Sequence, residues 1–400
     1  MSLSNNKPKE LIILTEHFAP SMGATAQLVT DLANDLHRMD VRIRVLTSTA
    51  GPADNPYPVH RFSVSSGNAV GILQKLTNGL FFFFGSAYWL LTKIKKHQSL
   101  FIVSNPPFIG LIGVLLSAFR GTRYVFLFQD IFPRSASLTG ILPAQGPLIS
   151  LWHRLLKIVL TRSESTVVLS ESMIRRCNLD FGHELDLSCI PNWAVFTPHS
   201  ISKTHSSLAS TWGLEDIFTV QYSGNFGRLH DILTILEAAR LLQSQQIQFI
   251  FVGGGAKSSQ IHCYCNRYGL SNVLIKPYLP RTLLADSLAA CDISIVSLIT
   301  GSEDTVAPSK FYGIIACSRP VLLISSKSSE LASLITTFQC GAVVPQGDVI
   351  LLAEQILFLK DNPKLVAEMG IRSRSLYEEK YGRSRSVAEY YQLFSRLDMV

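Results

Sequence analysis

The sequence is short of charge and of organised cysteine, and each shortage excludes a class of protein. Only 16% of the 400 residues are charged while 47% are hydrophobic, which excludes an intrinsically disordered chain. The seven cysteines are scattered, odd in number and without a CxxC pair, so they build no disulfide framework and favour a reducing compartment. His262, Cys263 and Cys265 lie close together, but no second ligand pair follows, and we expect no metal site.

Several catalytic motifs are also missing. The sequence has no Walker A motif, which counts against a kinase or NTPase, and no GxSxG nucleophile turn. A DxD motif is absent as well, which disfavours a metal-chelated nucleotide sugar of the single-domain kind. The net charge of +7 is too dilute to indicate nucleic acid, and no nucleic-acid partner is expected.

What charge there is lies unevenly along the chain. Residues 1–195 carry 18 Lys and Arg against 12 Asp and Glu, whereas the remainder carries 18 against 17. The basic excess therefore belongs to the first half, which favours an anionic surface or an anionic acceptor as its partner. The first apolar run, Leu11–Leu14, is too short for a signal peptide, so we expect a cytoplasmic protein.

The first half alternates short apolar runs with amphipathic stretches, as parallel α/β domains do. Leu28, Leu32 and Leu36 recur at helical spacing within Ala24–Arg38 and predict a helix there. Strands are predicted on both sides of it and further along, at Leu11–Leu14, Val41–Thr47, Leu100–Val103, Tyr124–Phe128, Thr166–Leu169 and Ser188–Ile190.

One stretch of the first half carries no charge for seventeen residues. Leu76–Thr92 contains four consecutive phenylalanines and is flanked by Lys75 and by Lys93, Lys95 and Lys96. It falls short of the ~20 apolar residues that a membrane span needs. Two interpretations remain, a helix buried on the sheet and an interfacial helix whose basic flank meets anionic lipid, and the composition favours the second.

The alternation weakens over 194–214, which is rich in Ser and Thr, and we predict a linker there. It then restarts. The sequence therefore predicts two tandem, doubly wound Rossmann-like α/β domains facing across a cleft, with C-terminal helices that cross back. The expected boundaries are 1–193 for an acceptor-binding domain, 215–380 for a nucleotide-sugar domain and 381–400 for a helix returning to the first domain.

Predicted elements of the second domain follow the same pattern. Strands are expected at Phe218–Tyr222, Gln248–Val252, Val273–Ile275, Ile293–Ser297, Val321–Ile324 and Ala342–Val344, and helices at His230–Gln243, Ala256–Tyr268, Arg281–Cys291, Phe311–Cys317 and Glu330–Phe338.

Two glycine-containing turns follow neighbouring strands of the second domain. Gly224 and Asn225 precede Arg228 after the first strand, and Gly253 and Gly254 follow the next strand. Glycines let backbone N–H groups approach an anion, and an arginine can bind phosphate oxygens with two hydrogen bonds. One such loop is more often a plain tight turn, but two in neighbouring loops favour a nucleotide or sugar phosphate.

A third element lies at Ala307–Lys310. Pro308 and Ser309 are ordinary residues for a helix start, with Ser309 expected as the N-cap. Lys310 is unusual there, because a cation in the first turn opposes the helix dipole. A bound diphosphate would relieve that conflict. The alternatives are a solvated lysine or a surface ion pair with Glu303 or Asp304, worth ~0–1 kcal/mol.

The first domain offers two weaker candidates. The small residues around Gly23, between the first strand and its helix, would let a sugar approach the helix N-terminus, although no GxGxxG motif is present. Asp130 follows another strand. It is expected with equal weight to be a catalytic or sugar-binding carboxylate or a helix cap.

Taken in order, several motifs resemble a known family. YSGNFGRLHDILTILEAARLL, FVGGGAK, PYLPRTLLADSLAACDISIVSL and EDTVAPSKFYGIIACSRPVLLI are similar to the C-terminal half of family-4 glycosyltransferases of the GT-B fold. LTEHFAPSMGATAQLVTDLANDL, FQDIFP and IPNWA are similar to the N-terminal half and hinge. The similarity is greatest to the bacterial enzymes that build exopolysaccharide, colanic acid or O-antigen.

The resemblance implies retaining, metal-independent transfer of a hexosyl or N-acetylhexosaminyl group from a UDP- or GDP-linked donor, with no other cofactor. It places Arg228, Lys310 and Ser309 at the diphosphate, and Gly23 and the glycine turns beside the donor. Pro277 and Tyr278 would lie at the nucleobase, and Glu303 would face the donor sugar. The implied acceptor is a polyprenol-diphosphate-linked saccharide at the inner face of the plasma membrane, where the protein would be peripheral.

The sequence departs from the family in several places: Glu303 matches the first of two family glutamates only with a two-residue shift, and Ser318 stands where glycine is usual. Gly313 stands where the second of two glutamates is usual, which puts a carboxylate contact to the ribose in doubt. Gln129 and Asp130 stand where many relatives carry a His-Asp pair, so a histidine acid is not implied and Asp130 inherits the candidate role. Two alternatives stay open, a GT-B epimerase or phosphorylase, and a non-catalytic binding protein that kept the fold.

Overall fold

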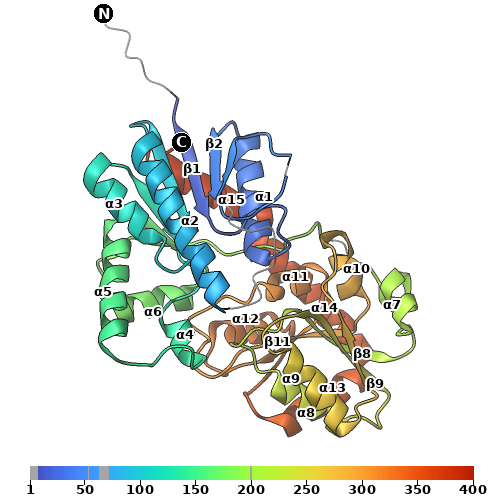
Figure 1. Cartoon of the computed structure of the whole chain (residues 1–400). Coiled ribbons are helices and arrows are strands. Elements are labelled where there is room, and N and C mark those ends of the chain that lie inside the picture. The colour runs from blue at the N-terminus through green and yellow to red at the C-terminus, as the bar shows by residue number, and fades with distance from the viewer. Residues whose placement is uncertain (1–7, 53, 63–71, 199–200) are drawn as a thin grey trace, which may run out of the picture. The chain divides into compact units, whose positions relative to one another are not determined.

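The computed structural model describes residues 8–52, 54–62, 72–198 and 201–400, and the chain divides into two compact units. The first comprises Met1–Ser137, Leu142–Pro191 and Ser384–Val400, and the second comprises Leu138–Ile141 and Asn192–Arg383. Each unit is built on a parallel sheet with helices packed against it (Figure 1). The predicted α/β class with two Rossmann-like domains is confirmed.

In the described part of the first unit, seven parallel strands run in the order β3-β2-β1-β4-β5-β6-β7. The strands are β1 (Glu10–Thr15), β2 (Ile43–Thr47), β3 (Val59–Arg61), β4 (Gln98–Val103), β5 (Tyr124–Leu127), β6 (Ser165–Val168) and β7 (Leu187–Cys189). The helices are α1 (Ala24–Arg38), α2 (Ile72–Lys93), α3 (Gly110–Arg120), α4 (Arg134–Leu138), α5 (Pro147–Arg162), α6 (Glu171–Phe181) and α15 (Arg383–Arg396).

Alternation along β4 explains how helices cover both faces of this sheet. Successive side chains of a strand point to opposite faces. Phe101 packs against Tyr390 and Phe394 of α15, with ring centroids 5.6 and 5.3 Å apart. Ile102 points to the other face, where a Cβ on Gly113 of α3 would lie only 2.8 Å from its side chain. The C-terminal helix is therefore part of the core of the first unit.

Helix α2 contains the uncharged stretch and has features of both interpretations. Among its buried side chains are Phe82 and Leu90. Its opposite face exposes four large apolar side chains at helical spacing, Leu80, Phe81, Phe84 and Tyr88. Within the described ranges, no helix combines the length and the apolar character that crossing a bilayer requires.

In the second unit, the described strands run in the order β10-β9-β8-β11-β12-β13, again all parallel. The strands are β8 (Phe218–Asn225), β9 (Ile247–Gly254), β10 (Val273–Lys276), β11 (Ile293–Ser297), β12 (Val321–Ile324) and β13 (Gly341–Val344). The helices are α7 (Ser207–Trp212), α8 (Leu233–Leu241), α9 (Ser258–Tyr268), α10 (Leu284–Ala289), α11 (Lys310–Ala316), α12 (Glu330–Phe338), α13 (Val349–Asp361) and α14 (Pro363–Leu376), with a π-helical turn at Tyr377–Tyr381.

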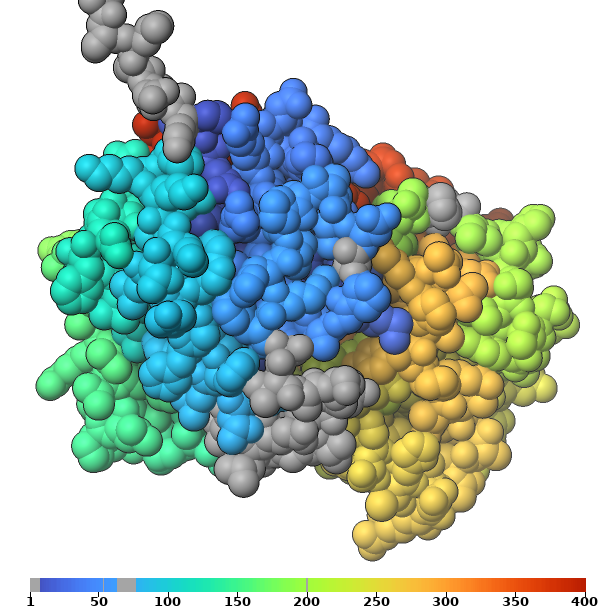
Figure 2. Space-filling model, turned by 45° about the horizontal axis from the view of Figure 1, so that its top comes forward, coloured from blue at the N-terminus to red at the C-terminus, as the bar shows by residue number. Residues whose placement is uncertain are grey.

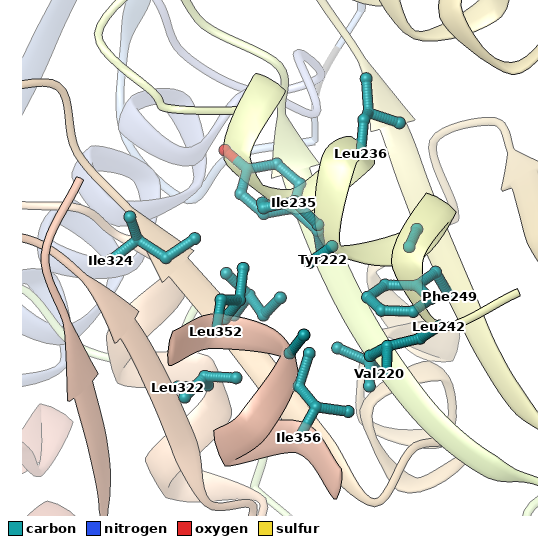
Figure 3. Close-up of a cluster of buried hydrophobic side chains, with 14 of the residues drawn as sticks. Val220, Tyr222, Ile235, Leu236, Leu242, Phe249, Leu322, Ile324, Leu352 and Ile356 are labelled. Atoms are coloured by element: carbon teal, nitrogen blue, oxygen red, sulfur yellow. The ribbon is translucent and has the colours of Figure 1, made fainter. Parts of the chain in front are cut away.

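A dense apolar cluster joins this sheet to its helices. Leu352 and Ile356 of α13 point toward Val220 and Leu322 on the strands, and Tyr222 lies in the same cluster (Figure 3). All five side chains are at most 1% exposed. Burial of this kind contributes ~25 cal/mol per Å² of apolar surface, so the cluster holds β8 firmly in the sheet.

Three segments differ from what the sequence predicts. The stretch 194–214, predicted as a linker, contains α7, and Ala209 and Leu214 are buried beside β9. Strands β8 and β9 run on through the glycines predicted as turns, because Gly224 pairs with Gly253 in the ladder. Helices α4, α5 and α6 were not predicted, although Leu148, Leu151, Leu155 and Ile158 of α5 recur at helical spacing.

We expect Gly253 to tolerate no side chain. A Cβ there would lie 2.0 Å from the carbonyl oxygen of Gly224, at a φ of +137°. Gly253→Ala should lower the free energy of unfolding by about 2 kcal/mol or more in urea denaturation of the full chain. Gly213→Ala is the matched control, because Gly213 has φ +68° and open space and should lose only about 1 kcal/mol. Equal losses would contradict the steric argument.

Candidate functional site

The candidate donor site lies at the carboxyl edge of the second sheet, where the direction of strand order reverses. The chain runs outward from β8 to β9 and β10, then returns to β11 on the other side of β8. Ligands of open α/β sheets bind at such a switch point. Gly224 and Asn225 end β8, the loop after β11 carries Glu303 and Ser309, and Lys310 is the first residue of α11.

Lys310 is the most constrained of these side chains. Its Nζ donates a hydrogen bond to the hydroxyl of Tyr222, lies 3.7 Å above that ring and lies 3.4 Å from the carbonyl oxygen of Asn225. Burial lowers the pKa of Lys310 well below its ordinary value. No carboxylate in the described part of the chain forms an ion pair with it. An anion placed here would supply the missing countercharge.

Glycines at the paired ends of β8 and β9 keep side chains away from this edge of the sheet, which leaves room for a ligand. Gly224 lies beside Lys310, since a Cβ on it would be 3.8 Å from the lysine Cε. Its carbonyl faces Gly253 across the ladder, and a side chain at either position would fill the space between β8 and β9. The edge therefore lacks side chains next to Lys310, which leaves space for a phosphate group beside the amine.

Two more functional candidates emerge that the sequence reasoning missed. Lys257 follows the glycines of β9 and donates from Nζ to the carbonyl of His230. Burial lowers the pKa of Lys257, the Asp231 carboxylate raises it, and Arg228 lowers it, so Lys257 lies near both an anion and a second cation. The signal available in the sequence was a second lysine directly after a glycine-rich strand end.

His230 is held neutral. Its Nδ1 lies 2.7 Å from the carbonyl oxygen of Ser297, which can only accept, so Nδ1 carries the proton. Burial lowers the pKa of His230 to about 3, and Lys310 and Lys257 lower it in the same direction. The ring thus leaves Nε2 as an acceptor at physiological pH.

The residues predicted at the nucleobase lie at the same edge. Tyr278 follows β10 and donates from its hydroxyl to the carbonyl of Gly254, 2.9 Å away. Its ring is half exposed, and Pro277 beside it is exposed, so both present a flat apolar surface to solvent. Arg228 is also exposed, within the loop between β8 and α8.

The remaining predicted residues of this unit differ in how they are held. Glu303 accepts a hydrogen bond of 2.7 Å from the side-chain amide of Gln346, which fixes its carboxylate beside the end of β13. Ser309 occupies the N-cap position of α11, but its side chain makes no capping hydrogen bond, contrary to expectation. Gly313 is buried, and a Cβ on it would lie 3.2 Å from Phe196. A glutamate would not fit there without repacking.

The first unit carries the two other candidates. Gly23 is the exposed N-cap of α1, and the hydroxyl of Thr25 in that helix donates to the side-chain carbonyl of Gln129. Asp130 follows β5 with an exposed side chain. Desolvation by its surroundings raises the pKa of Asp130 to about 6. Asp130 is no helix N-cap, because α4 begins only at Arg134.

The second unit brings six of the predicted residues together through direct contacts: Gly224, Asn225, Gly253, Gly254, Tyr278 and Lys310. Gly23 and Asp130 belong to the first unit. In the part of the chain that the structure describes, no group of His, Cys, Asp and Glu side chains is arranged to hold a metal ion. The geometry suits an anionic, phosphate-bearing ligand.

Comparison with known sequences shows which proteins this chain is similar to. Residues 212–376 match the family model of glycosyl transferases group 1. WbjE of Pseudomonas aeruginosa, a probable glycosyltransferase, is 25% identical over 309 residues, which is 75% of each chain. WcaI of Escherichia coli (strain K12), a glycosyl transferase provisionally assigned to colanic acid biosynthesis, is 28% identical over 156 residues, or 38% of each chain.

Solved structures share the fold along nearly the whole chain. Sucrose-phosphate synthase of Thermosynechococcus elongatus superimposes with a TM-score of 0.78 at 17% identity, covering 97% of this chain and 99% of that one. HepE of Anabaena, solved in complex with UDP-glucose, gives 0.74 at 14% identity, covering 96% and 99%.

The neutral state of His230 predicts a pH dependence of stability. The unfolded chain binds a proton at this histidine near pH 6.5, whereas the folded chain does so only near pH 3. Stability should therefore fall as the pH drops below 6.5, by up to about 1.4 kcal/mol per pH unit. Urea unfolding at pH 6.5, 5.5 and 4.5 measures it.

The contribution of His230 is isolated by substitution. His230→Gln should lose less stability than the parent over that pH range, while His262→Gln, at an exposed position of α9, should follow the parent. Parallel curves for all three proteins would show that His230 is not held neutral.

Proposed function

We propose that the chain, which has the GT-B fold, is a glycosyltransferase of the polysaccharide-biosynthesis type, and that it transfers a sugar with retention from a nucleotide diphosphate donor, without a metal. The acceptor we propose is a polyprenol-diphosphate-linked saccharide. The observation that carries the donor half of the proposal is the Lys310 amine, which lies unpaired by any described carboxylate beside the open glycine backbone of β8 and β9.

The chemistry follows from electrostatics. When the bond to the sugar breaks, negative charge develops on the diphosphate that leaves. A cation and backbone N–H groups already fixed in place stabilise that charge without reorganising. Lys310 supplies the cation once the diphosphate lies beside it, because a neighbouring anion favours the charged amine, while Arg228 and Lys257 add positive charge on the loops after β8 and β9. These three side chains make a metal ion unnecessary for departure of the leaving group.

The rest of the donor has counterparts around the same edge. Tyr278 and Pro277 offer a flat surface on which a base can stack, and Glu303 offers a fixed carboxylate to sugar hydroxyls. A uracil base is favoured over guanine because HepE, which shares the fold, was solved with UDP-glucose. Gly313 leaves the ribose without the carboxylate that relatives of the family place there.

On the acceptor side we assign Asp130 as the group that takes the proton from the acceptor hydroxyl. A carboxyl group with a pKa near 6 is a carboxylate at neutral pH and retains useful basicity. The exposed apolar face of α2 and its lysines at 93, 95 and 96 suit a location at the inner face of an anionic membrane.

A second candidate function is a binding protein without catalysis, and Gly313 is the observation that favours it. Nucleotide affinity alone does not separate the two functions, whereas turnover of a nucleotide sugar does.

An epimerase of the same fold would isomerise the donor sugar with no acceptor present, which chromatography of UDP-N-acetylglucosamine incubations detects.

Lys310→Ala and Arg228→Ala should each weaken binding of UDP. Removing a hydrogen bond to a charged group costs about 1.5–3 kcal/mol, so we expect roughly a 10- to 100-fold rise in Kd for Lys310→Ala by titration calorimetry. Arg228 is exposed and should give a smaller rise. Lys364→Ala, on α14, is the control cation and should bind as the parent does. Unchanged affinity in both site variants would remove the donor assignment.

Asp130→Asn should lower transfer and change its pH dependence. In the parent, transfer should increase as the pH rises through about 6, because the carboxylate is the active form. The variant should show low transfer without that rise, while its UDP affinity stays unchanged. A rise near pH 6 that persists in Asp130→Asn would assign the titration to another group.

A further inference from the structure

A groove of about 120 Å³ lies between helices α3 and α5 of the first unit. Its walls are apolar or aromatic, and they include Phe108, Leu111, Leu148, Leu151, Trp152 and Leu155. Sites that enclose a whole small ligand measure ~300–1,000 Å³, so this groove has room for one segment of a longer apolar molecule.

Helices α3 and α5 approach each other closely because α3 has a glycine at the contact. A Cβ on Gly110 of α3 would lie 2.5 Å from a methyl group of Val159 on α5, so only glycine allows this packing. The hydroxyl of Tyr124 on β5 donates to the carbonyl of Val159, 2.6 Å away. The floor of the groove is therefore fixed by both helices and by the sheet.

The outer edge of the groove continues onto an exposed apolar stripe. Leu148, Leu151, Leu155 and Ile158 of α5 are spaced by three, four and three residues and are 61, 52, 36 and 43% exposed. Soluble surfaces rarely leave such a row uncovered. Helix α2, whose atoms are light blue in Figure 2, packs against α3. The exposed side chains of α2 include Leu80, Phe81, Phe84 and Tyr88.

Aromatic rings connect the groove to the predicted acceptor residue. Phe83 of α2 lies 5.9 Å from Phe108, which lies 6.1 Å from Trp152, and Trp152 lies 4.8 Å from Phe132. Phe132 is two residues beyond Asp130. A chain seated in the groove would thus end near the carboxylate assigned to the acceptor.

The charge of this region fits an anionic head group. Between residues 72 and 163 the sole acidic residue is Asp130. The same stretch contains ten basic residues, namely Lys75, Lys93, Lys95, Lys96, Arg120, Arg123, Arg134, Arg154, Lys157 and Arg162. Arg123 is paired with Glu164, which lies just beyond the stretch, whereas the exposed members, such as Lys93, Lys95 and Lys96, attract a diphosphate or an anionic bilayer.

We propose that the groove between α3 and α5 binds the isoprenoid segment of the lipid-linked acceptor, with the exposed leucines of α5 resting in the bilayer interface. The aromatic walls suit the branched, unsaturated chain of a polyprenol, and the link through Trp152 and Phe132 leads its diphosphate end toward Asp130. The identity of the chain as part of the acceptor rests on the proposed function.

The probe for a test is farnesyl diphosphate carrying a benzophenone group. After irradiation of the full chain, peptide mapping should find the label within residues 105–111 and 148–159. Undecaprenyl phosphate should compete for labelling, and dioleoyl phosphatidylglycerol at the same concentration should not. Equal competition by the two lipids, or a label elsewhere, would overturn the proposal.

Variants separate the groove from the donor site. The double variant Leu151→Gln, Leu155→Gln should lower labelling by about fivefold or more, because apolar contact is lost at two exposed positions that leave the core intact. Leu179→Gln, at a 72% exposed position of α6, is the control and should label as the parent does. Unchanged labelling in the double variant would overturn the proposal.

Titration with UDP distinguishes the two ways of failing. The double variant should keep the UDP affinity of the parent, and Lys310→Ala should keep its labelling. If the parent binds UDP but is not labelled, the groove proposal is wrong and the donor assignment stands. If the parent is labelled but does not bind UDP, the donor assignment is wrong and the groove proposal stands.

Discussion

The contact between Lys310 and Tyr222 is the interaction on which the donor site depends. Tyr222 is 1% exposed and belongs to the apolar cluster of the second unit, yet its ring and hydroxyl hold the lysine amine at the carboxyl end of β8. A flexible lysine would lose side-chain entropy on binding an anion. Here that entropy is lost on folding, and apolar burial of Tyr222 offsets it.

The same constraint explains why the surrounding groups are neutral or backbone. A carboxylate near Lys310 would occupy the place of the ligand, and His230 carries no positive charge that would add to the repulsion among the cations. The glycines keep side chains out of the space between β8 and β9. The site is thus positively charged but uncrowded, as a charged leaving group requires.

Both units share one strand order over their first six strands, and each places candidate residues at or next to the point where that order reverses. In the second unit these are the ends of β8 and β11, and in the first they are the loops after β1, β4 and β5, which carry Gly23, Phe108 and Asp130. The first unit differs in its outer layer. Helices α2, α3 and α5 expose apolar rows among basic residues, whereas the second unit has 16 basic against 15 acidic residues.

The sequence alone determined the α/β class, the bounds of α1 and the site elements that its motifs mark, because apolar periodicity and turn residues are local signals. It missed α5, α7 and the roles of Lys257, Tyr222 and His230. Those roles arise from residues far apart in the chain, such as 222 with 310 and 230 with 297. Burial and countercharge are properties of packed neighbours, so only the tertiary structure decided which basic residues are fixed and which are solvated.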